Sequence, residues 1–442
     1  MQVYKFGGTS AGSAERISNI AEILKNKKDI IVVLSAMSGT TDRLTAIAGL
    51  LHEGRKKEAA DENELLRAHY NSVAEELFRD KGIKKEALEM ISSHFDYIRT
   101  FTLKEFNRKQ EKAILAQGEL LSTALLLLCT KEKGISSSLL PALNYMRIDK
   151  DGEPDMFYIK ENLYRELEKH SNSNLLITQG YICRDAYGEI ENLKRGGSDY
   201  TATITGAVLE ADEIQIWTDI NGLHNNDPRY VNGTKVIRKL SFDEAAELAY
   251  FGAKILHPSS ILPAREKNIP VRLKNSLKPE DQGTIISSGY KRKGYKAVAA
   301  KDGISAIKIK SDRMLMAYGF LRKIFGIFEV YKTSIDMITT SEVAVSLTID
   351  DSTHLGQIVK ELEELGKVEV EHKQVIICII GDFIAESSGT TVDIFDALKG
   401  IPLRMISYGG SRHNISLLAD GRYKAEALRA LNEKLFKKGD NV

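Results

Sequence analysis

The segment Lys5–Ser10, with the sequence Lys-Phe-Gly-Gly-Thr-Ser, is the part of the chain whose residue types best suit chemistry on a phosphate. Paired glycines let backbone N–H groups approach a polyphosphate closely, and a lysine ammonium beside them offsets the charge of a phosphoryl group in transfer. Neither a Walker A loop nor a Gly-x-Gly-x-x-Gly dinucleotide fingerprint occurs in the sequence. The segment predicts a phosphate-handling site, with an ordinary strand-to-helix turn and a solvated lysine as the alternative.

Further polar side chains come in short clusters next to predicted strands or helices. They are the hydroxyl-rich stretch 35–41, the stretch 195–199 (Arg-Gly-Gly-Ser-Asp), the stretch 217–219 (Trp-Thr-Asp) and the stretch 227–229 (Asp-Pro-Arg). The carboxyl ends of parallel strands share one edge of a sheet, where open α/β folds bind their ligands. Taken singly, each hydroxyl or acid is more typical of a turn or helix cap, and Arg195 of a surface ion pair.

Taken together, these clusters favour a kinase. An arginine clamps a carboxylate through two parallel hydrogen bonds, a lysine offsets charge on phosphoryl oxygens, and acids hold Mg²⁺ or an acceptor amine. Glu119 is a further candidate, predicted as a mid-helix carboxylate whose alternative role is a solvated surface charge. The nine histidines show no metal-ligand spacing, so no metal held by a dedicated protein cage is expected.

The elements that must position these clusters alternate between strands and helices. Ile30–Leu34 is a continuous apolar run typical of a parallel strand covered on both faces, and the runs at 175–178 and 213–217 are similar. Apolar residues at helical spacing lie between them, and the charged stretch 52–112 predicts surface helices. The first part of the chain is therefore predicted to be an α/β layered domain. The stretch 287–303, rich in Gly, Lys and Ser, predicts a linker.

Beyond the predicted linker, short strands and helices recur in one order. Strands are predicted at 304–309 and 343–349 with a helix at 319–331 between them, and the order begins again with a strand at 375–380. Two small α+β units in tandem account for this pattern. By itself the pattern favours a structural or oligomerising role for them.

The whole-chain numbers exclude several classes of protein. With 442 residues, 43% hydrophobic and 28% charged, the chain has the composition of a soluble globular protein of two or three domains. Its 62 basic and 61 acidic residues leave no global field for nucleic acid or an anionic membrane, so neither is an expected partner. Cys129, Cys183 and Cys378 form no Cys-x-x-Cys pair, which argues against a disulfide framework. A cytoplasmic location is expected, because no basic and then apolar leader opens the chain and the leucine-rich run 124–128 is too short for a bilayer.

Joined together, the motifs resemble those of the aspartate kinases in the amino-acid-kinase superfamily, in the monofunctional lysine-sensitive type, over essentially the full chain. The matching segments are 5–10, 33–36, 117–122, 178–181, 195–201, 217–219, 227–229 and 251–258. Four later segments are similar to the tandem ACT domains of that family: 319–321, 336–342, 406–409 and 413–414. The resemblance implies a three-layer αβα kinase domain with a mainly parallel sheet over residues 1–290. Two α+β ACT-like domains would follow, over residues 303–374 and 375–442.

The resemblance also implies the reaction, which is ATP-dependent phosphorylation of the β-carboxylate of L-aspartate to 4-phospho-L-aspartate. This is the first step of lysine, threonine and methionine biosynthesis, and it would use ATP with Mg²⁺. A carboxylate is already deprotonated at neutral pH, so positioning and charge stabilisation would carry catalysis without a general base.

Site residues follow from the resemblance where the motif is present. Lys5 and Asp199 would be catalytic, with Lys5 stabilising the γ-phosphoryl group. The aspartate-binding residues would be Ser35, Thr41, Glu119, Arg195, Ser198 and Asp199. The nucleotide-binding residues would be Lys5, Gly7, Gly8, Ser10, Thr218, Asp219, His224, Asp227, Arg229 and Lys254. His224 stands where relatives often carry tyrosine, and Tyr181 where they carry phenylalanine.

Feedback inhibition by L-lysine at the first ACT-like unit is the regulatory expectation, across a homodimer built by these units or a higher assembly. The lysine-binding residues would be Met314, Phe320, Leu321, Ser334, Asp336, Thr340, Ser341 and Glu342. Ala317 stands where lysine-sensitive relatives often have serine, which keeps threonine as an alternative effector.

Two other functions stay open at this stage. One is a superfamily member that acts on glutamate, carbamate or a nucleoside monophosphate, against which the tandem ACT-like region and the Phe-Gly-Gly-Thr-Ser signature argue. The other is a non-catalytic amino-acid sensor, against which intact Lys5, Arg195 and Asp199 argue.

Overall fold

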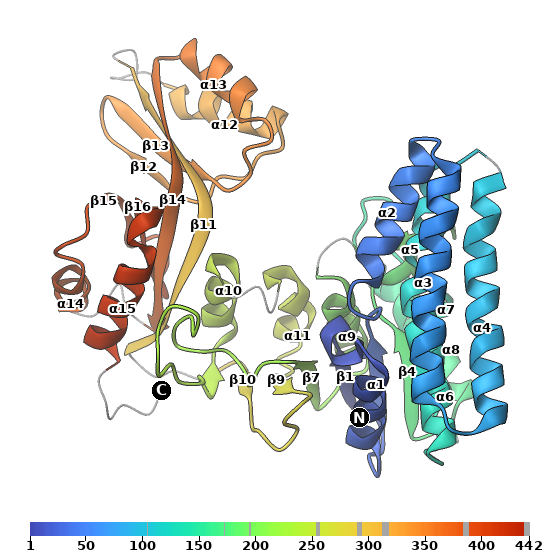
Figure 1. The fold of residues 1–442 in the computed structure, drawn as a ribbon. Coiled ribbons are helices and arrows are strands. Elements are labelled where there is room, and N and C mark those ends of the chain that lie inside the picture. Colours follow the sequence, from blue (N-terminus) through green and yellow to red (C-terminus); the bar gives the residue numbers. More distant parts are fainter. Residues whose placement is uncertain are drawn as a thin grey trace. The chain divides into compact units, whose positions relative to one another are not determined.

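The computed structural model describes residues 1–103, 105–171, 173–193, 196–252, 257–289, 294–311, 318–382 and 389–436. The chain forms two compact units, which are described separately (Figure 1). The first unit comprises Met1–Leu223, Arg238–Phe242 and Leu256–Gly289. The second comprises His224–Ile237, Asp243–Ile255 and Tyr290–Val442. Segments 224–237 and 243–255 thus group with the C-terminal part, although the predicted kinase domain ran through residue 290.

The first unit is built on an eight-stranded sheet in the order β3-β4-β2-β1-β7-β9-β10-β8. Its strands are β1 (Gln2–Phe6), β2 (Ile30–Leu34), β3 (Ser138–Leu139), β4 (Leu175–Gln179), β7 (Glu213–Thr218), β8 (Lys239–Leu240), β9 (Val271–Asn275) and β10 (Thr284–Ile286). All neighbouring pairs are parallel except β9 with β10. The three predicted strands of this sheet are confirmed, and the mainly parallel sheet brings their carboxyl ends to one edge.

Helices cover both faces of this sheet. They are α1 (Ala14–Leu24), α2 (Thr40–His52), α3 (Lys56–Leu77), α4 (Lys81–Thr100), α5 (Arg108–Leu115), α6 (Gln117–Glu132), α7 (Ala142–Tyr145), α8 (Met156–Lys169), α9 (Gly197–Val208) and α11 (Leu262–Glu266). Side chains alternate along a strand, so Ile30 and Val32 of β2 join a core with α1, α3 and α6, whereas Ile31 joins a second core with α8 and α9. The predicted three-layer αβα arrangement is confirmed.

One helical stretch of this unit is strongly apolar. Among the described residues, the helical stretch Arg108–Glu132, which contains α5 and α6, is long and apolar enough by composition to span a membrane. Its most apolar window is 83% buried inside the protein, and Leu121 and Leu125 lie in the first core. The stretch is therefore a core helix. The leucine-rich run 124–128 noted from the sequence is only a part of this apolar stretch.

The second unit contains a six-stranded antiparallel sheet in the order β12-β13-β11-β14-β16-β15. Its strands are β11 (Gly294–Lys310), β12 (Ile338–Thr340), β13 (Ala344–Ile349), β14 (Lys367–Asp382), β15 (Leu403–Ser407) and β16 (Asn414–Asp420). Its helices are α12 (Phe320–Val330), α13 (Leu355–Glu363), α14 (Thr390–Ala397) and α15 (Lys424–Leu435), together with most of α10 (Phe242–Phe251). The α+β character predicted for this region is confirmed.

The two ACT-like halves of this sheet share the long strands β11 and β14. Residues 297–301 of β11 pair with 376–380 of β14, whereas residues 305–310 pair with 344–349 of β13. Val298 accordingly joins the core that contains α14 and α15, and Ile307 joins the core that contains α12 and α13. The linker predicted over 287–303 is wrong for 294–303, because these residues find strand partners that are distant in sequence.

Candidate active site

Lys5 and Asp199 form an ion pair at the carboxyl edge of the parallel sheet. β1 lies between β2 and β7, and Lys5 is its penultimate residue. The Lys5 Nζ atom lies 2.6 Å from Oδ1 of Asp199, and each side chain is only 12% exposed. Asp199 lies in the first turn of α9. The two predicted catalytic residues, far apart in sequence, are thus brought together.

The glycine segment after β1 packs tightly against the loop that follows β2. The Gly7 N–H donates to the Trp217 carbonyl oxygen at 3.2 Å. A Cβ atom on Gly8 would lie 2.9 Å from the carbonyl oxygen of Ala36, so only glycine fits there without a backbone shift. The Ser10 hydroxyl lies 2.9 Å from the Ser276 hydroxyl. Ser10 is thus held by a protein partner, and its predicted contact with a nucleotide stays a prediction.

Glu119 places a buried carboxylate beside the same loop. Its Oε1 atom accepts the N–H of Ala36 at 3.2 Å. Its Oε2 atom is buried with no hydrogen-bond partner among the residues that the structure describes. Burial raises the pKa of this carboxyl to about 8. The side chain is only 3% exposed and lies in the first turn of α6. The solvated alternative for Glu119 is therefore wrong, whereas its mid-helix position agrees with the helical stretch Arg108–Glu132.

Ser35 and Thr41 belong to the two ends of this loop. The carbonyl oxygen of Ser35 accepts the Ser122 hydroxyl at 2.8 Å, and the Ser35 N–H donates to the Phe6 carbonyl at 3.1 Å. These bonds hold the end of β2 against both α6 and β1. Thr41 is half-buried in the first turn of α2. The loop whose Ala36 N–H binds Glu119 therefore also carries hydroxyl groups at its two ends.

The start of α9 packs against the loop after β4. A Cβ atom on Gly180 would lie 2.3 Å from the Cβ of Ser198, so the absence of a side chain lets this turn approach the helix. Tyr181 has a left-handed backbone with φ of 65°. Its N–H donates to the Thr201 hydroxyl at 3.0 Å. Burial, assisted by the charge of Glu119, raises the pKa of the Tyr181 hydroxyl to about 12. Tyr181, noted from sequence only as a replacement, is thus bound to the first turns of α9 through Thr201.

The strand ends of β7 and β9 form the other side of the edge. The Thr218 hydroxyl accepts the Ile220 N–H at 3.1 Å, and Asp219 is exposed. The Thr218 carbonyl oxygen accepts the N–H of Ser276 at 2.8 Å. Sequence reasoning missed Ser276. The alternating strand pattern of 271–275, followed by a serine, is the signal that could have found it.

Several predicted residues lie elsewhere. His224, Asp227 and Arg229 belong to the second compact unit. Burial lowers the pKa of His224, and its Nδ1 lies 2.8 Å from the Thr234 hydroxyl. Arg229 binds Asp227 at 2.6 Å, with 76% of the arginine side chain exposed. Three further predicted residues fall outside the described part of the chain: Arg195, Lys254 and Met314.

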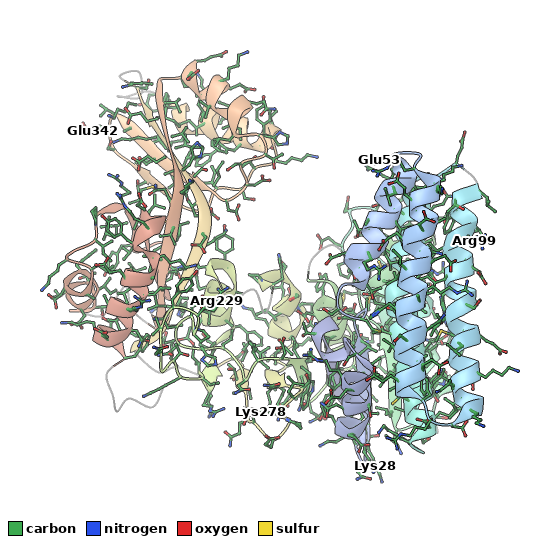
Figure 2. The ribbon with its side chains drawn as sticks, viewed as in Figure 1. Lys28, Glu53, Arg99, Arg229, Lys278 and Glu342 are labelled. Carbon is green, nitrogen blue, oxygen red and sulfur yellow. The ribbon has the colours of Figure 1, made fainter. Side chains whose placement is uncertain are left out.

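The predicted effector residues are divided between core and surface. Phe320 is buried in the core of the first ACT-like half, and Leu321 is partly exposed on the same helix. Asp336 accepts hydrogen bonds from Tyr250 and Lys301. The exposed polar members are Ser334, Thr340, Ser341 and Glu342, of which Glu342 lies between β12 and β13 (Figure 2).

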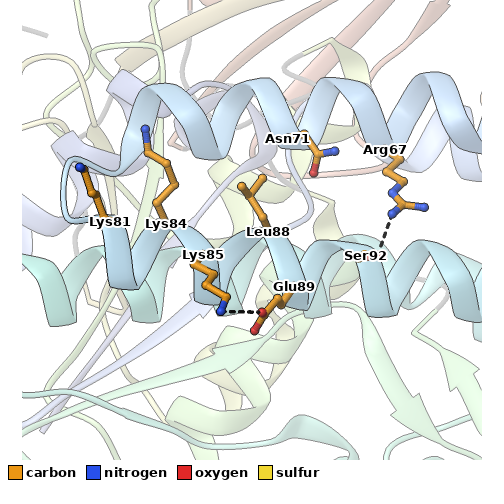
Figure 3. Close-up of a pocket in the computed structure, with 8 residues that line it drawn as sticks. All are labelled: Arg67, Asn71, Lys81, Lys84, Lys85, Leu88, Glu89 and Ser92. Carbon is orange, nitrogen blue, oxygen red and sulfur yellow. Dashed lines mark hydrogen bonds and ion pairs between the residues drawn. The ribbon is translucent and has the colours of Figure 1, made fainter.

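A groove lies between α3 and α4 in the first unit (Figure 3). It has a volume of 530 Å³ and is lined by Arg67, Asn71, Lys81, Lys84, Lys85, Leu88, Glu89 and Ser92. Much of its charge is balanced locally, since Lys84 binds Glu75 at 2.9 Å and Lys85 lies 3.7 Å from Glu89. No predicted site residue lines it, so the strand ends remain the candidate active site.

Comparisons with known proteins agree with this geometry. The amino acid kinase family profile matches residues 1–275, and an ACT domain profile matches residues 377–435. The chain is 33% identical to lysine-sensitive aspartokinase 3 of Escherichia coli, with 98% of this chain and 99% of the relative covered. It is 34% identical to the chloroplastic aspartokinase 3 of Arabidopsis thaliana, with 98% and 81% covered.

Solved structures give the same result. The crystal structure of E. coli aspartokinase III in complex with aspartate and ADP matches with a TM-score of 0.84 at 32% identity, covering 99% of this chain and all of that one. The structure of the same enzyme with lysine and aspartate matches with a TM-score of 0.82 at 32% identity, with the same coverage. Sequence and structure thus agree along the whole length, and the chain belongs to the amino acid kinase family and, within it, to the aspartokinases.

Proposed function

We propose that this aspartokinase transfers the γ-phosphoryl group of ATP to the β-carboxylate of L-aspartate, giving ADP and 4-phospho-L-aspartate. The observation that carries the proposal is the Lys5–Asp199 pair at the carboxyl edge of the sheet, in the same unit as the buried carboxylate of Glu119. The relatives named above are aspartokinases, and one of them was crystallised with aspartate and ADP. The product would enter lysine, threonine and methionine biosynthesis.

The chain's own residues supply positioning and charge. Lys5 would move its ammonium from Asp199 toward the phosphoryl oxygens, where negative charge develops in the transition state. The Oε2 atom of Glu119, which has no hydrogen-bond partner among the described residues, suits the ammonium of aspartate, and Arg195 suits one of its carboxylates. The attacking carboxylate is already deprotonated, so no side chain needs to remove a proton.

Mg²⁺ would accompany ATP and neutralise charge on its phosphates. Within the described residues, no group of three or more His, Cys, Asp or Glu side chains is placed to hold an ion. Acids such as Asp199 and Asp219 lie at the carboxyl edge of the sheet. With these residues we expect Mg²⁺ to be held mainly by phosphate oxygens and water, as is common for this ion. We propose the same roles for the remaining residues predicted to bind aspartate or the nucleotide. Among them, the Ser10 hydroxyl is hydrogen-bonded to that of Ser276.

The C-terminal region would make the enzyme sensitive to L-lysine. The E. coli relative is named lysine-sensitive and was crystallised with lysine. In this chain the proposed ligands are the eight residues from Met314 to Glu342 named above. We further propose a homodimer built by the ACT-like halves and a cytoplasmic location, with no membrane or nucleic-acid partner.

The test is ATP-dependent formation of an acyl phosphate, trapped as a hydroxamate, over a panel of amino acids. We expect product with L-aspartate and little with glutamate, and lower activity when lysine is added. Preferred use of glutamate, carbamate or a nucleoside monophosphate would indicate a different member of the family. Amino-acid binding without hydroxamate or ADP formation would indicate a sensor.

A further inference from the structure

A buried charge cluster in the second unit surrounds Asp336, one of the proposed effector ligands. Its Oδ1 atom accepts the Tyr250 hydroxyl at 2.7 Å and the Lys301 ammonium at 2.7 Å. The Asp336 side chain is fully buried, and the Lys301 side chain is 18% exposed. Lys301 also binds Asp350 at 2.8 Å and lies 4.4 Å from the centre of the Tyr250 ring. The carboxylate expected to bind a free lysine is thus already bound to a lysine of the chain.

This cluster fastens the last turn of α10 to the ACT-like sheet. Tyr250 is the penultimate residue of α10, Lys301 lies on β11, and Asp336 and Asp350 flank β12 and β13. A Cβ atom on Gly252 would lie 2.9 Å from the carbonyl oxygen of Ala300, so the backbones of the two segments touch here. Tyr250 and Lys301 therefore connect α10 to the strands of the effector half.

The electrostatics of the cluster allow two arrangements. Burial opposes the charge of Lys301, but hydrogen bonds to Asp336 and Asp350 raise the pKa of its ammonium. Oδ2 of Asp336 is buried with no hydrogen-bond partner in the described part of the chain, so it leaves an acceptor for a second ammonium. Two ammonium groups on one carboxylate repel each other strongly in a poorly hydrated site. Asp350, which is 41% exposed, gives Lys301 a second carboxylate to which it can move.

We propose that the Lys301 ammonium is an internal competitor for the Asp336 carboxylate, so that an effector lysine displaces it toward Asp350 and loosens the contact of Tyr250, on α10, with Asp336. The proposal rests on the proposed lysine inhibition and adds how the effector site reaches the kinase unit. Because the Asp336 side chain is fully buried, an incoming ammonium reaches it only when neighbouring side chains move. In the order of the chain, α10 follows β8 of the first unit and precedes residues 257–289, which again belong to the first unit.

The experiment separates binding from inhibition in the full-length protein. Lysine binding is measured by titration calorimetry, and inhibition by the hydroxamate assay, for wild type, Lys301→Met and Tyr250→Phe. Removing the competing ammonium leaves Asp336 with the Tyr250 hydroxyl but without a cation, so lysine should bind Lys301→Met about tenfold or more tightly. The activity of Lys301→Met should respond to lysine much less than that of wild type, because this variant already lacks the contacts of Lys301 with Asp336 and Tyr250. Tyr250→Phe should show the same two changes to a smaller degree.

The matched control is Lys308→Met, which removes an exposed lysine from the same strand and should bind and respond as wild type does. If Lys301→Met and Tyr250→Phe bind lysine no more tightly than wild type, or if binding and inhibition weaken together, the exchange at Asp336 is refuted while lysine inhibition stands. If wild type neither binds lysine nor is inhibited by it, the proposed regulation fails and the exchange fails with it. Thermal unfolding of each variant shows whether the fold is retained.

Discussion

Lys5 owes its proposed role to its position beside a buried partner. Its ammonium is bound to Asp199 at 2.6 Å, which holds it at the strand end. Lys5→Ala should lower kcat by about 10²–10³-fold, the usual loss when one preorganised donor to a developing charge is removed. The KM for ATP should change much less.

Steady-state kinetics with ATP varied at saturating aspartate measure this split. Lys28→Ala, at an exposed lysine in the same unit (Figure 2), should leave both constants unchanged. A Lys5→Ala enzyme with near-normal kcat and only a weaker affinity for ATP would show that Lys5 binds the ground state alone.

Glu119 predicts a pH dependence of stability with a definite sign. Burial raises its pKa to about 8 in the folded protein, whereas a glutamate in an unfolded chain has a pKa of about 4.3. Between these values the folded state holds a proton that the unfolded state has lost. The contribution of Glu119 to the free energy of unfolding therefore falls as pH rises from about 4.3 to 8. As the pH rises from 5 to about 8.5 in the absence of aspartate, the Tm of Glu119→Gln should therefore fall less than the Tm of wild type.

The same shift links aspartate binding to a proton. An ammonium placed on Oε2 favours the charged carboxylate, so aspartate should release a proton as it binds below about pH 8, and its affinity should rise with pH through that range. Calorimetry in two buffers of different ionisation enthalpy counts this proton. Binding without proton release in wild type, or with equal release in Glu119→Gln, would assign the ammonium to another group.

At the scale of elements, the start of α9 depends on a glycine in the loop after β4. A Cβ atom on Gly180 would lie 2.3 Å from Ser198 Cβ and 2.8 Å from its Cα, so Gly180→Ala must move the helix turn that carries Ser198 and Asp199. Such overpacking typically costs about 1–3 kcal/mol of stability. We expect a lower Tm and a raised KM for aspartate.

Gly49→Ala is the control for this prediction. Gly49 lies inside α2, and no atom in the described part of the chain lies within 4 Å of its added Cβ, so alanine there should raise stability by about 0.5–1 kcal/mol and leave kinetics unchanged. Urea unfolding and aspartate titrations measure both variants. Normal aspartate kinetics in Gly180→Ala would mean that the α9 turn tolerates movement.

At the scale of the whole molecule, the chain does not follow a simple order of one domain after another. Residues 224–237 and 243–255 leave the first compact unit for the second, and the chain returns for residues 257–289. Within the second unit, the single long strand β11 is part of both ACT-like halves. The predicted boundaries at 290, 303 and 374 stay predictions about domains. The contacts explain why a linear reading of composition is a poor guide to such boundaries: strand pairing joins segments regardless of their order.

The sequence by itself determined the local elements and the set of candidate residues. The apolar run Ile30–Leu34 predicted β2 with its observed bounds, because a strand buried on both faces needs an uninterrupted apolar segment. Likewise the Lys-Phe-Gly-Gly segment indicated a strand followed by a tight turn. These features depend on residues adjacent in the chain, which is why they can be read from it.

Only the tertiary structure decided how those residues are used. The Lys5–Asp199 contact, the burial of Glu119 and the extension of β11 through 294–303 each depend on partners distant in sequence. The binding of Asp336 to Lys301 and Tyr250 was likewise absent from any local pattern. Burial and pairing set the pKa and the available partners of a charged group, and both are properties of the folded chain.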